Sequence, residues 1–436
     1  MATVISRRRT TILAGALLAL AVVGCASTGR QAEAPTDYMG RLSTLEDGKV
    51  RVSVAALSAE EGNAAYGVDL ADKGIQPVWV EVDNHQDRAY WLLPAGLDPN
   101  YFPASEAAEA FAPDASKGSD ELAQRFQSLA FQNPAPPGKT SGFILVHRDE
   151  GVKIVHIDLV ATGDARSFSF LVLVPGFRAD YAVNDVFRRE VYPSSDVVDY
   201  TDSDAFRKAL ETLPCCVSNE KGSKTGDPLN LVIVGGLEDA FPSLVRRGWS
   251  PTEVTWKGSV MRMMKSAMSR ERYPYAPISN LYLFGRPQDI ALQKARDNIH
   301  QRNHLRLWRS AMLYHGQPVW VGQISRDIGS RLTIHSPTLT THKIDPDVDE
   351  AARALFEDLA YSQGLRAIGL VKGVGAASKS APRENLTTDP YYTAGLRSVL
   401  LFDSAPTSLT QIEVLPWEPF GRGFLKPATE IETGEP

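Results

Sequence analysis

Apolar and polar residues alternate along several segments between residues 45 and 175. Val50, Val52 and Val54 have polar neighbours between them. Successive side chains of a strand point to opposite faces of a sheet, so this spacing predicts half-buried β-strands. The other segments with this pattern, or with a continuous apolar run, are residues 78–82, 143–146, 155–159 and 168–174. We therefore expect an antiparallel β-sandwich of immunoglobulin-like type over residues 41–180.

Helical spacing interrupts these strands. The sequence predicts helices over residues 105–111 and 119–131. In the second helix Leu122, Phe126 and Leu129 fall on one side, which is typical of a stripe that packs against a core.

From about residue 205 the pattern changes to strands that alternate with helices. The predicted strands are residues 230–234, 281–284, 304–308, 318–324, 368–371 and 398–402. The predicted helices are residues 237–247, 287–300 and 348–363; the second has proline at its first position and Leu292, Ala295 and Ile299 on one side. We expect an α+β domain over residues 200–405 and a loose tail over residues 415–436. The predicted fold class is thus mixed α+β, with a β-sandwich followed by an α+β domain.

The N-terminus has the features of an export signal. Arg7, Arg8 and Arg9 precede an apolar run over residues 12–23, and Gly24 and Cys25 follow it. A membrane span needs about 20 apolar residues, so this short run predicts a cleaved signal peptide over residues 1–24. Small and polar residues then predict a flexible tether over residues 25–40.

The segment from Val22 to Cys25 resembles a bacterial lipobox, in which the cysteine after the cleavage site is acylated. That resemblance implies a lipid anchor on Cys25, and several acyl chains hold a protein on a membrane far more firmly than one. Ala26 stands where an aspartate would retain a Gram-negative lipoprotein in the inner membrane. The expected location is therefore the outer membrane, facing the periplasm, with Sec and twin-arginine export both left open.

Charge and cysteine content narrow the function classes. The chain has 46 basic and 52 acidic residues, a net charge of −6, which disfavours nonspecific nucleic-acid binding.

Apart from Cys25 the chain contains only two cysteines, the adjacent Cys215 and Cys216. Their Cα atoms are closer than in ordinary disulfides, so we expect either a labile vicinal disulfide or two small residues packed in a turn. No cofactor and no metal site are predicted.

One cluster stands out as a candidate site. Five of the eight histidines fall between residues 300 and 342, and the span 286–331 carries a net charge of +5. On the predicted strand, His304 and Arg306 share the face opposite Leu305 and Leu307. Arginine and histidine suit recognition of phosphate or carboxylate, and the alternative is a solvated surface with structural ion pairs.

The acidic run Asp345 to Asp349 precedes a predicted helix. Carboxylates are favoured at such a position because they cap the helix and interact with its dipole. We therefore expect capping here. The chain contains no GxSxG, HExxH or GxGxxG motif.

Several blocks in order resemble the LssY C-terminal domain family, over roughly residues 200–405. The resemblance implies a bacterial origin. In some members the domain is joined to membrane phosphatase-like segments, and no catalytic role follows from it. The blocks begin at Pro228 (PLNLV), Gly248 (GW), Tyr273 (YPYAPIS), Leu281 (LYLFGRPQD), Arg302 (RNHLRLW), Pro318 (PVWVG) and Thr341 (THKIDPDVDE).

Two functions are therefore considered. The first is a lipid-anchored envelope protein with a binding or scaffold role, in which the basic cluster meets an anionic ligand or partner protein. The second is a hydrolase of an envelope phosphoester or lipid. Here His304 would be the general acid/base, Arg286 and Arg306 would hold the anion, and His342 with Asp345 would form a second pair. Convergence of these side chains in a pocket would favour catalysis.

Overall fold

The computed structural model describes residues 38–111, 119–149, 152–174, 191–252, 276–295, 302–332, 340–403 and 405–419. Contacts between Cα atoms separate residues 1–36 from a compact unit of residues 37–436. The predicted signal peptide, Cys25 and most of the tether lie outside the described residues, and so does residue 180, the expected end of the sandwich. No helix in the described part of the chain is long and apolar enough to cross a membrane.

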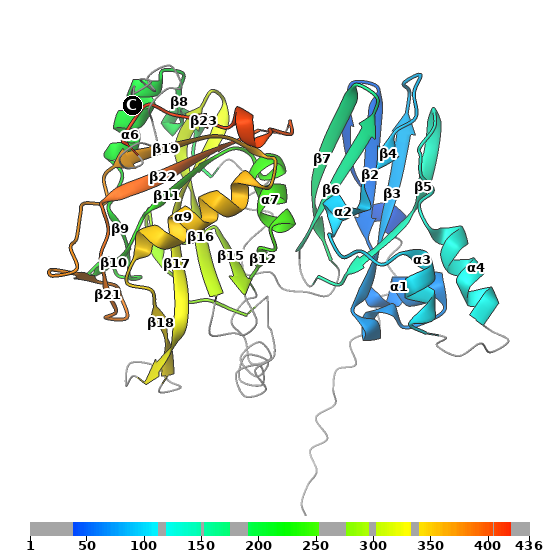
Figure 1. The fold of residues 1–436 in the computed structure, drawn as a ribbon, viewed down its shortest axis with the longest axis horizontal. Helices are drawn as coiled ribbons and strands as arrows, with labels where there is room; N and C mark the ends of the chain where they lie inside the picture. The colour runs from blue at the N-terminus through cyan, green and yellow to red at the C-terminus, as the bar shows by residue number, and fades with distance from the viewer. Residues whose placement is uncertain are drawn as a thin grey trace, which may run out of the picture. The chain divides into compact units, whose positions relative to one another are not determined.

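Two antiparallel sheets form the first part of the described chain (Figure 1). One has the order β1 (Ser43–Asp47), β2 (Val50–Ala56), β3 (Ile75–Asn84) and β5 (Gly138–His147). The other has the order β4 (Trp91–Leu92), β6 (Val152–Ala161) and β7 (Asp164–Leu173). Val52 and Val80 from the first sheet and Ile157 from the second are fully buried in one core cluster. The alternation of apolar residues thus correctly predicted a sandwich.

Short helices connect these strands: α1 (Ala59–Tyr66), α2 (Pro94–Leu97), α3 (Ala104–Glu109) and α4 (Ser119–Leu129), with 3-10 helices η1 (Tyr38–Arg41) and η2 (Leu70–Lys73). Ser58 caps α1, because its hydroxyl accepts a hydrogen bond from the Glu61 amide. Phe126 of α4 is fully buried and meets Tyr66 edge to face, with ring centroids 4.7 Å apart. The predicted stripe on α4 therefore packs against a core.

A ten-stranded sheet organises the rest of the chain. Its main path is β12 (Ser250–Pro251), β15 (Ile290–Ala295), β16 (Arg302–Tyr314), β17 (Gln317–Leu332), β11 (Leu231–Val234), β22 (Leu396–Phe402), β19 (Leu365–Lys372) and β23 (Glu413–Val414). Two more strands lie off this path: β18 (Thr340–Ile344) pairs with β17 and β8 (Val198–Tyr200) pairs with β16. The pairs β11–β22, β19–β23 and β8–β16 are parallel and the other pairs are antiparallel.

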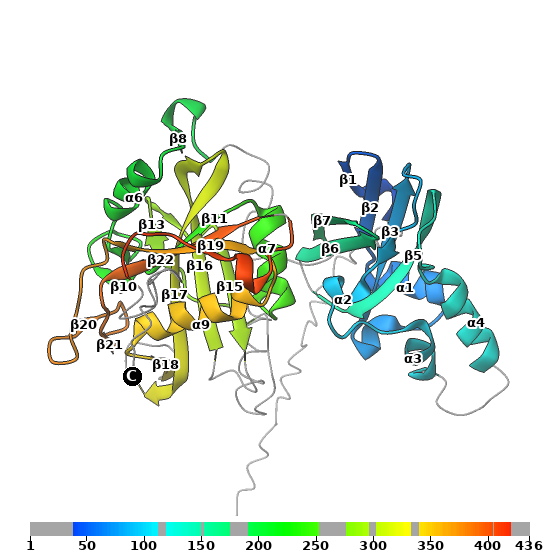
Figure 2. The same ribbon diagram turned by 45° about the horizontal axis from the view of Figure 1, so that its top comes forward.

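Helices cover both faces of this sheet. Figures 1 and 2 show α9 (Val348–Ala360) lying across β15, β16 and β17. Leu355 of α9 and Leu244 of α7 (Leu237–Arg246) share a core cluster with Leu305 and Leu307 of β16. On the opposite face, Phe206 of α6 (Ser203–Glu211) packs in a second cluster with residues of β11 and β22. The mixed α+β class is therefore confirmed.

Smaller elements complete the described fold. They are β9 (Cys216–Ser218), β10 (Thr225–Pro228), β13 (Tyr282–Leu283) and β14 (Arg286–Pro287) in one sheet, β20 (Arg383–Glu384) and β21 (Pro390–Tyr391) in another, and the 3-10 helices η3 (Ser194–Asp196) and η4 (Leu409–Gln411).

Two sequence predictions are wrong. The segment expected to be a helix over residues 287–300 contains the strand β15, which pairs with β12 and β16. Ile290 and Leu292 point into the core on one face, so tertiary packing overrides the local helix signal. The expected loose tail does not begin at residue 415, because Leu415 and Trp417 are buried in the cluster around α6. Residues 420–436 lie outside the described residues.

Candidate functional site

His304 and Arg306 lie on β16 and share the face opposite Leu305 and Leu307, as the sequence predicted. The antiparallel register places Gln293 of β15 beside His304, and Gln323 of β17 beside Arg306. We call six of the polar residues that the three strands present on this face the inner polar layer. Its members are Gln293, Arg302, His304, Arg306, Gln323 and Asp327.

The inner polar layer is buried. Arg302, His304 and Arg306 are 3%, 5% and 7% exposed, and Asp327 is 2% exposed. This part of the basic cluster is therefore not the solvated surface that the sequence offered as an alternative. Burying charged side chains is costly unless they are paired and hydrogen-bonded, so the partners of each member decide what the layer does.

His304 and Asp327 form a buried pair. Nε2 of His304 lies 2.7 Å from Oδ2 of Asp327. Burial lowers the pKa of His304 to about 4, although the Asp327 carboxylate acts in the opposite direction. The ring is therefore neutral at neutral pH. Because a carboxylate only accepts hydrogen bonds, Nε2 carries the single proton and Nδ1 is an acceptor.

The two arginines are held by protein oxygens. Arg306 donates to the Ser279 carbonyl through Nε and Nη2, at 3.2 and 3.0 Å, and to Oε1 of Gln323 through Nη1, at 2.9 Å. Arg302 donates to Oε1 of Gln293 at 2.8 Å, and its Nε lies 3.7 Å from the Asp327 carboxylate. The layer is therefore preorganised around two cations.

Among the described residues, Nδ1 of His304 and Nε2 of Gln323 are buried side-chain atoms of the layer without a hydrogen-bond partner. The orientation of the Gln323 amide is set by Arg306, which donates to its oxygen and leaves the amide nitrogen as a donor. An acceptor and a donor are thus left without partners in one buried layer. Leaving such an atom unpaired costs about 1–3 kcal/mol, which is the reason to look for a ligand here.

A second carboxylate lies near Arg306. Asp227 of β10 is 9% exposed, and burial raises its pKa although the charge of Arg306 acts against this. Asp389, 4% exposed, adds to the rise through its own negative charge. Burial and the charge of Asp389 thus act together on the pKa of Asp227, against the charge of Arg306.

The other predicted site residues lie elsewhere. Arg286 donates to both carboxylate oxygens of Asp289, each at 2.8 Å, and to the Arg309 carbonyl at 2.7 Å. It is thus engaged in a local ion pair and not in the inner polar layer. The structure pairs His342 with Ser330 through the backbone of β17 and β18, and the side chain of His342 lies outside the described residues.

Asp345 belongs to the start of a helix. Its Oδ1 accepts a hydrogen bond from the Asp347 amide at 3.0 Å, and Asp347 in turn caps α9 by accepting from the Glu350 amide. The expected capping role of this acidic run is therefore confirmed. None of these contacts joins Asp345 to His304, so the proposed catalytic set does not converge among the described residues.

A separate pocket of about 200 Å³ lies where the parallel strands β11 and β22 end. Its polar lining includes Asp239, His315, Arg366 and Asp403. Two carboxylates against one arginine and one histidine leave no excess of positive charge, so this pocket does not select anions. Across the described residues no three histidine, cysteine, aspartate or glutamate side chains gather as a metal site would require.

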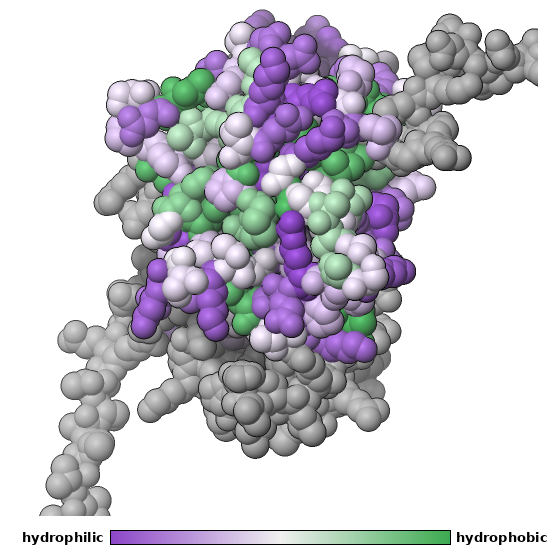
Figure 3. Space-filling view, turned by 90° about the vertical axis from the view of Figure 1, so that its left-hand side faces the viewer, coloured by the Kyte–Doolittle hydropathy of each residue, from purple (hydrophilic) through white to green (hydrophobic). Residues whose placement is uncertain are grey.

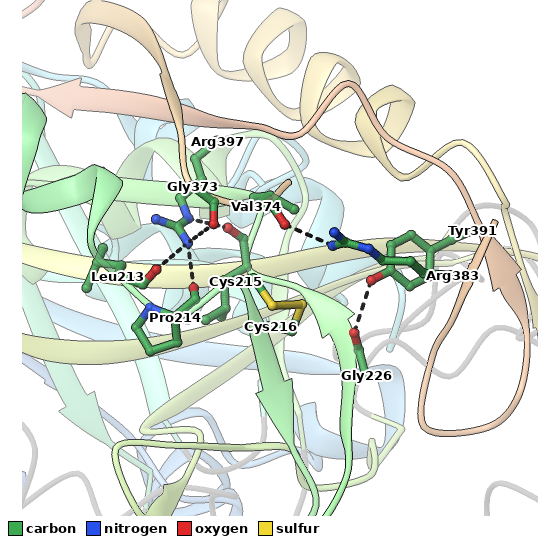
Figure 4. The surroundings of a disulfide bond; sticks show 11 residues. Leu213, Pro214, Cys215, Cys216, Gly226, Gly373, Val374, Arg383, Tyr391 and Arg397 are labelled. Carbon is green, nitrogen blue, oxygen red and sulfur yellow. Dashed lines mark hydrogen bonds between the residues drawn. A yellow bond between two sulfur atoms is a disulfide. The ribbon is translucent and has the colours of Figure 1, made fainter. Parts of the chain in front are cut away.

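Cys215 and Cys216 are joined by a disulfide, with Cα atoms 3.7 Å apart (Figure 4). Cys216 opens the strand β9 and is 9% exposed. The redox state of this pair in the cell stays a prediction.

The surface of this part of the molecule is mixed in character. Figure 3 shows hydrophilic and hydrophobic residues interspersed over one face, with several hydrophobic residues across its middle. This face therefore presents no large, uniformly hydrophilic region.

Sequence reasoning missed Gln293, Gln323 and Asp327. A signal was available, because the tight turn at His315 and Gly316 joins two long strands whose antiparallel pairing sets residue 304 opposite residue 325. Side chains at residues 323 and 327 then share a face with His304. The pairing with β15 had no such signal, since that segment was expected to be helical.

Comparison with known proteins identifies a domain. Residues 207–396, less than half of the chain, match the family described as LssY C-terminus. This range includes every residue of the inner polar layer and both adjacent cysteines. A search of curated proteins found no match for the chain.

Proposed function

We propose that this chain, whose residues 207–396 form an LssY C-terminal domain, is a lipid-anchored cell-envelope protein that binds an anionic group at its inner polar layer. The observation that carries the binding role is the unpartnered pair of buried atoms, Nδ1 of His304 and Nε2 of Gln323, in a layer built around two arginines.

The chemistry of the layer favours a phosphate or carboxylate group. Gln323 offers an N–H donor, and the arginines supply positive charge in a buried environment where electrostatic attraction is strong. Neutral His304 offers an acceptor at Nδ1 and so fits a protonated oxygen of the ligand. When the ligand group is fully ionised, His304 is expected to take up a proton and donate from Nδ1 instead.

Binding is therefore coupled to protonation. The pKa of free His304 is lowered to about 4 by burial, and an anion placed beside Nδ1 raises it again. By linkage, the affinity for a fully ionised anion increases as the pH falls from 8 toward 5. The direction of this pH dependence distinguishes binding at His304 from a general salt effect, in which the affinity does not follow the protonation of a histidine.

Envelope attachment is the second part of the proposal. It is supported by the basic, apolar and small residues that lead to Cys25 in the order of a lipobox. The residue after Cys25 is alanine, which favours the outer membrane and a periplasmic location. The anchor would hold the folded unit near a surface rich in phosphate groups.

The binding test uses the purified full-length protein and inorganic phosphate as the probe. Thermal unfolding is followed at constant ionic strength while phosphate replaces chloride. We expect the unfolding midpoint to rise with phosphate concentration, and to rise more at pH 6 than at pH 8. Acetate in place of phosphate tests the carboxylate alternative.

The variant His304→Gln tests the role of Nδ1 of His304. A glutamine amide can still donate to Asp327 from the position of Nε2, but it has no counterpart of Nδ1. This variant is expected to lose most of the phosphate-dependent rise. His156→Gln, the same change at a buried histidine of the sandwich, is the control and should keep it. An unsubstituted protein that shows no dependence on phosphate or acetate would make the layer purely structural.

A hydrolase is the second candidate, and one observation favours it. An aspartate that orients the histidine and a second ring nitrogen left as a base are the arrangement used in general base catalysis. Release of p-nitrophenol from p-nitrophenyl phosphate tests it. If the unsubstituted protein turns over this substrate and His304→Gln does not, the site is catalytic. If the unsubstituted protein shows no turnover, the binding role is retained.

The anchor is tested by Cys25→Ser. We expect the unsubstituted protein to sediment with membranes and the variant to be recovered in the soluble fraction. A variant that still sediments after a high-salt wash would show that Cys25 is not the anchor.

A further inference from the structure

The adjacent cysteines lie next to a buried arginine that has an unusual set of partners. Arg397 of β22 is fully buried, and within the described part of the chain its guanidinium donates only to backbone carbonyls. These are the carbonyls of Leu213, Pro214 and Gly373 (Figure 4) and of Leu210 and Leu229. Among the described residues no carboxylate forms an ion pair with it. Burial lowers the pKa of Arg397 to about 10, so it remains a cation at neutral pH.

This cation is distant from the disulfide in sequence but contacts the backbone next to it. Nη2 of Arg397 binds the carbonyl of Pro214, the residue directly before Cys215. The Cys215 carbonyl in turn accepts a hydrogen bond from the Leu229 amide at 2.8 Å, and Arg397 also binds the Leu229 carbonyl at 2.8 Å. The backbone that carries the two sulfur atoms is therefore held against a positive charge that lacks a counter-ion.

Other charged and titratable groups around the pair do not cancel that charge. Figure 4 draws Arg383 and Tyr391 in the surroundings of the disulfide. Arg383 donates to the Val374 carbonyl at 2.9 Å, and the hydroxyl of Tyr391 donates to the Gly226 carbonyl at 3.3 Å. Asp227 follows on β10, where burial raises its pKa and favours the neutral acid.

We propose that Cys215 and Cys216 form a redox-active site, which an external dithiol reduces and whose thiolate form Arg397 stabilises. The pair is suited to reduction because the peptide bond keeps adjacent Cα atoms about 3.8 Å apart, less than in ordinary disulfides. A thiolate next to an arginine is favoured over the thiol, and a thiolate is the better leaving group in exchange.

The exchange balances as a two-electron step. A thiolate of the dithiol attacks Sγ of Cys215, which is half-buried, and the sulfur–sulfur bond to the more buried Cys216 breaks. Cys216 leaves as a thiolate, and in this proposal its negative charge is stabilised by the Arg397 cation, which binds the Pro214 carbonyl at the start of the same segment. The second thiol of the reductant then displaces Cys215, so the reductant becomes a disulfide and the protein pair gains two electrons and two protons.

The first experiment measures reduction in the folded protein. The full-length protein is incubated with dithiothreitol without denaturant, the thiols are alkylated, and the peptide carrying residues 215 and 216 is analysed by mass spectrometry. We expect both cysteines of this peptide to become labelled. A peptide that is labelled only after unfolding in guanidinium would overturn the proposal. Cys25 does not affect the result, because it lies in another peptide.

The second experiment measures the pKa of the reduced pair from the rate of iodoacetamide alkylation at different pH values. The folded protein should show a midpoint below about 8.5, the ordinary value, and the same protein unfolded in guanidinium is the matched control. Equal midpoints in the two states would overturn the role of Arg397.

Two variants locate the charge. Arg397→Met is expected to slow alkylation at pH 7 by about tenfold, which corresponds to a rise of one pKa unit. Because Arg397 binds five backbone carbonyls, circular dichroism is used to check that the Arg397→Met variant is folded. Arg383→Gln removes a half-buried arginine and should slow alkylation in the same direction by a smaller factor. If Arg397→Met does not fold, the comparison of folded and unfolded protein decides the proposal alone.

Discussion

Two buried histidines, one in the sandwich and one in the LssY C-terminal domain, have similar surroundings and different partners. His156 of β6 is 4% exposed, and its Nε2 lies 2.8 Å from the Asp158 carboxylate. His304 of β16 is 5% exposed and pairs with Asp327 in the same way. Burial is the largest effect on both rings, and it lowers the pKa of each.

The difference lies at the other ring nitrogen. Nδ1 of His156 is 2.7 Å from the hydroxyl of Ser169, which stands directly opposite on β7. Nδ1 of His304 has no partner. Both ring nitrogens of His156 therefore have partners: Ser169 at Nδ1, and Asp158 and the Nη2 atom of Arg246 at Nε2, the last at 3.0 Å. His304 has a partner at one nitrogen, and this distinction, more than burial or a shifted pKa, separates a structural histidine from a candidate binding residue.

The largest expected effect comes from removing the two aspartates. Asp327→Ala leaves the buried guanidinium of Arg302 without its nearby carboxylate, and we expect a loss of about 3–5 kcal/mol in the free energy of unfolding. Asp158→Ala removes a partner of the His156 ring and a carboxylate near Arg246, which is only half-buried, and should cost less, about 1–2 kcal/mol. Denaturant unfolding measures both. Equal losses would mean that the charge of Arg302 is compensated elsewhere and that the two pairs are alike.

The pH dependence of stability gives the next largest effect. The pKa of His304 is lowered to about 4 in the folded protein, against about 6.5 unfolded, so between these values the unfolded state binds the extra proton. Stability contributed by neutral His304 is complete above pH 6.5 and is lost as the pH falls to 4, by about 3 kcal/mol. His304→Gln should flatten this part of the curve. An unchanged slope would show that His304 titrates normally.

The smallest effect is expected from Ser169→Ala. This change leaves Nδ1 of His156 without a partner and so gives the sandwich histidine the state that His304 already has. We expect a loss of about 1 kcal/mol, because a neutral hydrogen bond is removed from a partly exposed hydroxyl. Chemical denaturation at pH 7 checks it. A loss below about 0.3 kcal/mol would show that an unpartnered ring nitrogen is tolerated and would weaken the case for a ligand at His304.

The sequence predicted well which residues share the face of a strand, and it predicted poorly which distant residues contact them. His304 and Arg306 were correctly placed on one face of a strand, because alternation is a property of neighbouring residues. That this face is buried depends on Asp227, Ser279 and Gln293, which come from other segments and have no local signature. Arg286 was grouped with these residues by its charge alone, and the structure gives it Asp289 instead.

The segment around β15 shows why one local pattern was misread. Leu292, Ala295 and Ile299 have helical spacing, and Ile290 and Leu292 have strand spacing, so the sequence satisfies both patterns. The segment forms a strand because Gln293 pairs with Ser250 on one side and Leu292 pairs with Leu305 on the other. Only the neighbours of a strand settle such a case, and they are distant in the chain.

The position of β22 has a consequence for the synthesis of the protein. This strand is near the C-terminal end of the chain, yet it lies between β11 and β19 inside the sheet. Its parallel partner β11 ends at Val234, more than 160 residues before Leu396. The sheet therefore cannot be completed beside β11 until most of the domain has been synthesised. Until then one edge of β11 has no partner strand and is open to chaperones and to other chains.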